Sequence, residues 1–148
     1  DTCRQMWKTV VTIMSIMAMA KIMSHSGMIA EIAGMMVALT GSFYPAAAPF
    51  VGAIGTFVTG SGTSANVLFG GLQVETAGSL GLDPSWLAGA NTVGATIGKM
   101  ISPQSIAIGT AATASVGSES KILRKVIKYC VLFIIIAGLV AYAGSRFA

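Results

Sequence analysis

Charge is scarce in this sequence, and its scarcity sets the class of protein. Charged residues make up 9% of the chain, against about 25% in a typical soluble domain, while hydrophobic residues make up 54%. The mean hydropathy is +0.79. So few charges do not cover the surface of a soluble fold of 148 residues. We therefore expect an integral membrane protein.

Histidine and cysteine are nearly absent as well. His25 is the single histidine, and the two cysteines, Cys3 and Cys130, lie far apart. We therefore expect no catalytic triad, no multi-histidine metal site and no disulfide framework in this chain. We expect no enzymatic activity, no cofactor and no metal ion.

Nucleotide-binding motifs are also missing. The stretch "GATIGKM", residues 94–100, resembles a phosphate-binding loop, but three residues separate Gly94 from Gly98 and Met100 follows Lys99. A Walker loop needs four residues between its glycines and Ser or Thr after the lysine. The net charge of +4 is small and its basic residues flank apolar runs, so we expect no nucleic-acid partner.

The sequence does contain long apolar segments. Residues 5–23 and 126–144 each have about the 20 residues that cross a bilayer, and we expect a transmembrane helix at each. Residues 28–40 are apolar but shorter, which predicts a half-helix or an interfacial helix. The lipid bilayer is thus an expected partner, and the fold class is an all-α polytopic membrane protein.

Two further apolar segments are interrupted by polar residues. Residues 50–81 place "TGSGTSAN" between two arms that are each too short to cross, which predicts a re-entrant hairpin with its tip at residues 59–66. Residues 84–116 place "KMISPQS" between two half-helices, which predicts one crossing with an unwound middle. Such breaks are typical of secondary transporters, whose half-helix ends and freed backbone groups bind substrate near mid-membrane.

Basic residues predict the orientation of these segments. Lys121, Arg124, Lys125 and Lys128 precede the last apolar run, and Arg4 and Lys8 flank the first. Under the positive-inside rule both clusters lie in the cytoplasm, with residues 117–125 inside and residue 148 outside. Lys21 is the exception to this pattern.

The motifs around the two polar breaks resemble a known family. "TGSGTSANVLFGGLQ", "ANTVGATIGKMISPQSIAIGTAA" and the basic segment before residue 126 are similar to the C-terminal part of the L-lactate permease family. The resemblance implies a secondary active transporter that imports lactate, glycolate or similar 2-hydroxy-monocarboxylates with protons in a bacterial inner membrane. It also implies two inverted repeats, of which residues 1–148 supply the second hairpin and broken helix. The start at Asp1 fits a fragment that lacks its N-terminal portion, and a second copy forming a homodimer is a further expected partner.

The same resemblance implies the residues of the site. The substrate-binding candidates share polar side chains at the two breaks: Thr63, Ser64, Asn66, Asn91, Thr92, Thr96, Lys99, Ser102 and Gln104. The glycines expected to form the hairpin tip and the break are Gly60, Gly62, Gly94 and Gly98. His25 and Glu31 are the candidates for proton coupling.

Other interpretations of these residues stay open. Small polar residues also pack helix against helix in membranes, and Lys99 could extend to water rather than face an anion. The alternatives for the whole chain are another carboxylate or anion transporter of the same superfamily, including a sodium-coupled one, and a non-transporting membrane subunit.

Overall fold

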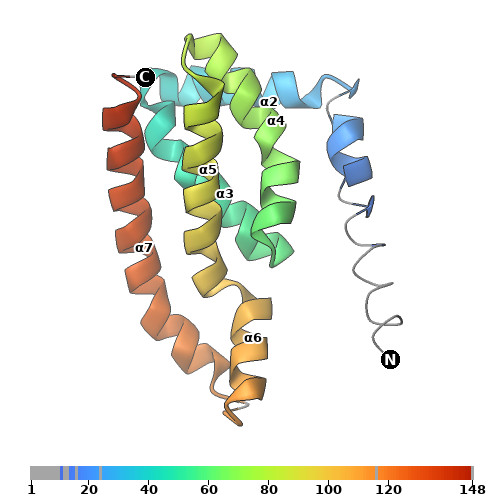
Figure 1. Cartoon of the computed structure of the whole chain (residues 1–148), viewed down its shortest axis with the longest axis vertical. Helices are drawn as coiled ribbons and strands as arrows, with labels where there is room; N and C mark the ends of the chain where they lie inside the picture. The colour runs from blue at the N-terminus through green and yellow to red at the C-terminus, as the bar shows by residue number, and fades with distance from the viewer. Residues whose placement is uncertain (1–10, 12–13, 16, 24, 116, 148) are drawn as a thin grey trace.

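The computed structural model describes residues 11, 14–15, 17–23, 25–115 and 117–147. The described elements are all helical, which confirms the all-α class (Figure 1). They are α2 (Met28–Thr40), η1 (Gly41–Phe43), α3 (Tyr44–Thr59), α4 (Gly62–Leu80), α5 (Pro84–Gly98), η2 (Lys99–Ile101), α6 (Pro103–Ala112) and α7 (Glu119–Gly144). Of the helix expected at 5–23, residues 5–10 lie outside the described part, and residues 17–23 are helical.

Helix α7 is the longest of the described elements, and many of its apolar side chains are exposed. Its 26 residues extend about 39 Å at 1.5 Å per residue, which exceeds the roughly 30 Å of a bilayer's hydrocarbon core. Large apolar side chains such as Leu132, Ile135 and Leu139 are exposed along it. A helix of this length with an exposed apolar surface is suited to lipid contact. The helix begins at Glu119 rather than at residue 126, because an acidic residue in the first turn favours a helix start.

Helices α3 and α4 form an antiparallel hairpin, whose α3 arm packs against α7 (Figure 1). Helix α3 begins at Tyr44, before the expected start of the hairpin at residue 50, because Pro45 occupies the first turn, where a missing N–H costs nothing. Its 16 residues extend about 24 Å, and the 19 residues of α4 about 28 Å. Each arm is therefore shorter than α7, and the hairpin turns back partway along it.

Helix α5 runs beside α3, and glycines set the distance between them. A Cβ added at Gly94 would overlap the carbonyl oxygen of Pro49, and one at Gly98 would overlap that of Ala53. Because both contacts advance by four residues, the two helices run in the same direction. This close approach of backbones through small residues is the usual packing of membrane helices. We call these contacts the α3–α5 seam.

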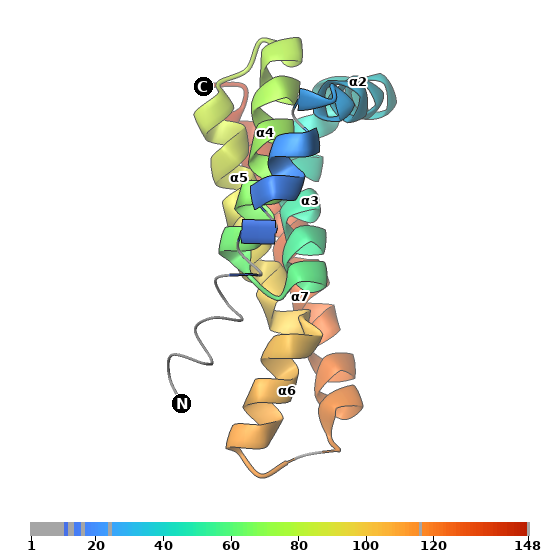
Figure 2. The ribbon, with the colours of Figure 1, turned by 90° about the vertical axis from the view of Figure 1, so that its right-hand side faces the viewer.

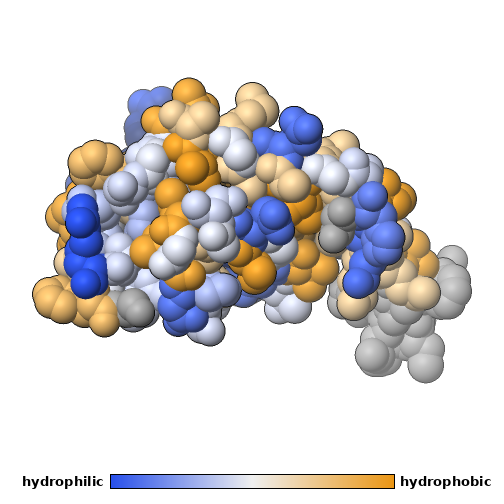
Figure 3. Space-filling view, turned by 90° about the horizontal axis from the view of Figure 1, so that it is seen from above, coloured by the Kyte–Doolittle hydropathy of each residue, from blue (hydrophilic) through white to orange (hydrophobic). Residues whose placement is uncertain are grey.

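Helix α2 lies across one end of the other helices (Figures 1 and 2). Residues Met28–Thr59 are long and apolar enough to be one span, and Glu119–Gly144 is the second such segment. The chain turns between α2 and α3, however, at Gly41, whose φ of 51° suits a glycine. The 32-residue segment is therefore two helices at an angle. Seen from this end, hydrophilic residues are interspersed among apolar ones (Figure 3).

Candidate functional site

The hairpin tip is shorter than the sequence predicts. Only Gly60 and Ser61 lie outside helices; Gly60 ends α3 with a φ of 70°, and Ser61 is extended. The Ser61 side chain accepts a hydrogen bond from the backbone N–H of Ser64 at 3.3 Å, so it caps α4. The expectation of a non-helical tip over 59–66 was therefore wrong for Thr59 and for residues 62–66. Thr63, Ser64 and Asn66 lie in the first turns of α4 instead, with Gly62 as its first residue.

The break between α5 and α6 is equally short. Helix α5 continues as a 3-10 turn over Lys99–Ile101, and Ser102 is extended before Pro103 opens α6. Proline disfavours the helical conformation in the residue before it, which explains why the break falls at Ser102. Gly94 was expected at a break, but it lies inside α5, where it serves the α3–α5 seam. Gly98 closes α5 and packs on α3 in the same way.

The tip and the break meet each other. The side chain of Gln104, in the first turn of α6, packs against Gly60 so closely that a Cβ there would overlap its amide oxygen. Helices α4 and α6 therefore both begin near this contact. Helix N-termini carry unpaired N–H groups and a partial positive charge. Two such ends at one place form an environment that favours an anion.

A buried chain of hydrogen bonds joins the hairpin to α5. The Tyr44 hydroxyl donates to the amide oxygen of Gln73 at 3.0 Å, and the Gln73 amide nitrogen donates to Asn91 Oδ1 at 3.2 Å. Asn91 Nδ2 then donates to Asn66 Oδ1 at 2.9 Å. Tyr44, Gln73 and Asn91 are almost completely buried. We call these four side chains the amide chain; it brings together two of the predicted site residues, Asn66 and Asn91.

Two buried hydroxyl groups near the break have no hydrogen-bond partner in the described part of the chain. They are Thr56 Oγ1, on α3, and Ser102 Oγ, at the break. Thr56 follows Ala53 of the seam and precedes Gly60, while Ser102 lies between their partners Gly98 and Gln104. A buried polar group without a partner is costly. Near the tip and the break, these two hydroxyl groups are therefore available to bind a ligand.

The remaining candidates lie on the surface of the described structure. Thr63, Thr92, Thr96, Lys99 and Gln104 are exposed. Thr92 and Thr96 donate to the backbone of their own helix, at 2.9 and 3.0 Å, and do not join the amide chain. Lys99 lies in the break itself.

The two proton-coupling candidates lie outside this cluster. His25 is exposed and its Nδ1 lies 2.9 Å from the carbonyl oxygen of Lys21. Glu31 is exposed in the first turn of α2. Neither makes a hydrogen bond to the tip, the break or the amide chain among the described contacts. Their role in proton coupling stays a prediction.

The sequence analysis missed Tyr44, Gln73 and Thr56. Gln73 follows Asn66 by seven residues, two helical turns, so both lie on one face of α4. A second amide side chain at that spacing in an apolar segment could have indicated that Gln73 belongs with Asn66. For Tyr44 the neighbouring prolines indicated a turn, and nothing local marked its hydroxyl as buried.

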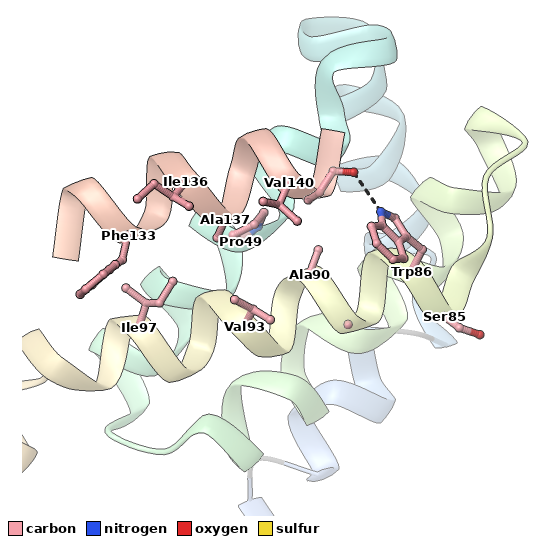
Figure 4. Close-up of a pocket in the computed structure, with 12 residues that line it drawn as sticks. Pro49, Ser85, Trp86, Ala90, Val93, Ile97, Phe133, Ile136, Ala137 and Val140 are labelled. Carbon is pink, nitrogen blue, oxygen red and sulfur yellow. Dashed lines mark hydrogen bonds between the residues drawn. The ribbon is translucent and has the colours of Figure 1, made fainter. Parts of the chain in front are cut away.

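A pocket away from the tip and break differs from them in chemistry. A pocket of about 550 Å³ opens between α5 and α7, lined by Trp86, Val93, Ile97, Phe133, Ile136 and Val140 among others (Figure 4). Trp86 donates its indole N–H to the Ala141 carbonyl at 2.9 Å, which leaves the lining apolar. No charged side chain lines it. The described lining offers a small anion no charged partner, so we assign the candidate site to the tip and break instead.

The fold and this site define a helical membrane protein, and comparison with known proteins identifies the family. The chain matches the L-lactate permease family over residues 1–146, and it belongs to that family. This confirms the resemblance seen in the sequence. No solved structure matches the chain.

Three named relatives show the degree of similarity. The L-lactate permease of Bacillus subtilis is 41% identical over 142 residues, covering 96% of this chain and 25% of the relative. The glycolate permease GlcA of Escherichia coli K12 is 42% identical over 131 residues, covering 88% and 23%. The L-lactate permease of Streptococcus iniae is 59% identical over 81 residues, covering 55% and 17%. The chain thus spans about a quarter of the length of the first two relatives.

Proposed function

We propose that this chain forms part of a secondary active transporter for small 2-hydroxy-monocarboxylates such as lactate and glycolate. The observation that carries the proposal is the meeting of two helix N-termini, those of α4 and α6, at the Gly60–Gln104 contact. A carboxylate fits such a place because it accepts hydrogen bonds from free N–H groups and is attracted to both helix dipoles. The names of two relatives, L-lactate permease and glycolate permease, fit the same substrate class.

Neutral and charged side chains would complete the site. Asn66, Ser102 and Thr63 supply amide and hydroxyl groups around the two helix ends, and Ser102 Oγ is without a partner in the described contacts. Lys99 would face the carboxylate from the break. A lysine at membrane depth is costly unless it faces a polar cavity or a partner, so a substrate anion is a suitable counter-charge.

The membrane arrangement belongs to the same proposal. The arms of the α3–α4 hairpin are shorter than α7, which supports a hairpin that enters and leaves on one side of an inner membrane. Lys121, Arg124 and Lys125 lie at the start of α7 and would be cytoplasmic. The rest of the transporter would supply the inverted repeat, and a proton would move with the substrate.

Uptake by the complete protein in liposomes tests the proposal. We expect lactate to accumulate when a pH gradient, acidic outside, is imposed, and not in response to a sodium gradient alone. Asn66→Ala should abolish uptake while the purified protein remains monodisperse. Loss of assembly together with uptake would instead favour a packing role, and a fully active Asn66→Ala protein would contradict the proposal. Thr113→Ala, at the far end of α6, is the matched control.

A further inference from the structure

The amide chain has a direction. A phenol carries one proton, which Tyr44 donates to Gln73 Oε1, and an amide has an oxygen that accepts and a nitrogen that donates. Gln73 must then turn its nitrogen to Asn91, and Asn91 must turn its nitrogen to Asn66. Each side chain thereby fixes the orientation of the next.

The end of this chain lies in the first turns of α4, beside the tip. Asn66 uses its oxygen to accept from Asn91, so its amide nitrogen stays available. That nitrogen donates to no protein acceptor among the described contacts, and Asn66 is half-buried rather than enclosed. If the chain ran in the opposite direction, Asn66 would offer an oxygen at the same place.

We propose that Tyr44 and Gln73 are positioning residues that fix this direction, so that Asn66 presents an N–H donor to the ligand and selects a group made only of acceptors, a carboxylate. The inference rests on the proposed function and deepens it. Tyr44 opens α3 and Gln73 lies two turns beyond Asn66 in α4, so both act through Asn91 and Asn66 rather than by touching substrate. A reversed chain would place the Gln73 nitrogen on the Tyr44 oxygen, so the Tyr44 proton would need another acceptor, and a buried donor without one is costly.

Lactate and its amide analogue, lactamide, distinguish this role from a general structural one. Both oxygens of lactate's carboxylate accept, so lactate needs the donor of Asn66. The lactamide head group has one acceptor and one donor, so it can turn to match either orientation of Asn66. Loss of direction in the chain should therefore weaken lactate more than lactamide.

The test uses Tyr44→Phe and, as an independent second variant, Gln73→Leu, each in the complete protein. Both remove the hydrogen bond that orients the chain and leave an apolar side chain of similar size. Tyr142→Phe is the matched control, because among the described residues its hydroxyl makes a side-chain hydrogen bond only with the exposed Arg146. Lactate affinity and the number of sites are measured with radiolabelled lactate, and lactamide affinity by competition.

We expect both variants to keep the number of sites and to bind lactate about two- to tenfold more weakly, since only a fraction of molecules would present the donor. Lactamide should change less than lactate, and the control should match wild type. Unchanged lactate affinity in both variants, or an equal loss for both ligands, would overturn the inference while leaving the proposed function intact. Absence of lactate binding in the wild-type protein would overturn the proposed function and this inference with it.

Discussion

The α3–α5 seam and the level of the tip and break use similar residues for opposite purposes. Along the seam, Gly94 and Gly98 pack against the backbone of α3 with no room for a methyl group. At the tip and break, one turn further on, Thr56 and Ser102 are buried without hydrogen-bond partners in the described part of the chain. Glycines thus hold α3 and α5 together along the seam, whereas the small polar residues near the tip and break keep their hydroxyl groups free of protein partners in the described part of the chain. Composition alone does not separate these roles, whereas the position of each residue along α3, or along α5 and the 3-10 turn that follows it, does.

The largest expected effect is the loss of stability on substituting a glycine of the α3–α5 seam. Gly94→Ala should destabilise the protein by about 3 kcal/mol, the upper end of the usual cost of overpacking, because the new Cβ would overlap the backbone of Pro49. Gly89→Ala, on the same helix with nothing within 4 Å, should be neutral or slightly stabilising. Thermal unfolding of the two purified variants measures the difference. Equal stability would show that the seam is looser than described.

The next effect concerns the break and should appear in binding rather than stability. Lys99→Gln should weaken lactate binding by about 1.5–3 kcal/mol, the range for a hydrogen bond to a charged group, with little change in unfolding temperature. Lys99→Arg should restore only part of the affinity, because a planar guanidinium does not replace a compact ammonium. Lys121→Gln, at the start of α7, is the control. Normal affinity in Lys99→Gln would make Lys99 a residue that faces water.

The smallest effect compares the two serines that precede α4 and α6. Ser61→Ala should cost about 1 kcal/mol of stability, since it removes the cap on Ser64 N–H. Ser102→Ala should cost no stability, because its hydroxyl has no partner among the described residues, but it should weaken lactate binding. Denaturation and binding assays on both variants are the measurements. A Ser102→Ala protein that is as destabilised as Ser61→Ala would mean that both serines are structural.

The sequence predicted the features that depend on local chemistry. The turn at Gly60, where φ is positive, falls within the predicted tip of residues 59–66. The break at Ser102 falls within the predicted break "KMISPQS". The bounds were less accurate, because a serine cap lets α4 begin at Gly62 and Pro45 lets α3 begin at Tyr44. The polar residues of these segments predicted non-helical chain, but in the structure they lie at the starts of α4 and α6.

Features set by tertiary packing could not be predicted in the same way. Gly94 was taken for a break residue, since a glycine that packs against another backbone looks the same in sequence as one that ends a helix. The pairing of Tyr44 with Gln73 joins residues 29 positions apart, and no local pattern indicates it. Asn66 and Asn91 were selected for their polarity, but only the structure shows that they contact each other.

Protection of a single thiol by substrate tests the central claim most directly. Thr63→Cys places a thiol on the exposed side of the first turn of α4, and Ala111→Cys places one near the end of α6 as a reference. Both are labelled in the complete protein with a small maleimide, with and without lactate. If lactate binds where α4 and α6 begin, it should slow labelling of the Thr63→Cys thiol and leave the Ala111→Cys thiol unchanged. Equal labelling of the Thr63→Cys thiol with and without lactate, in a protein that binds lactate, would contradict the account.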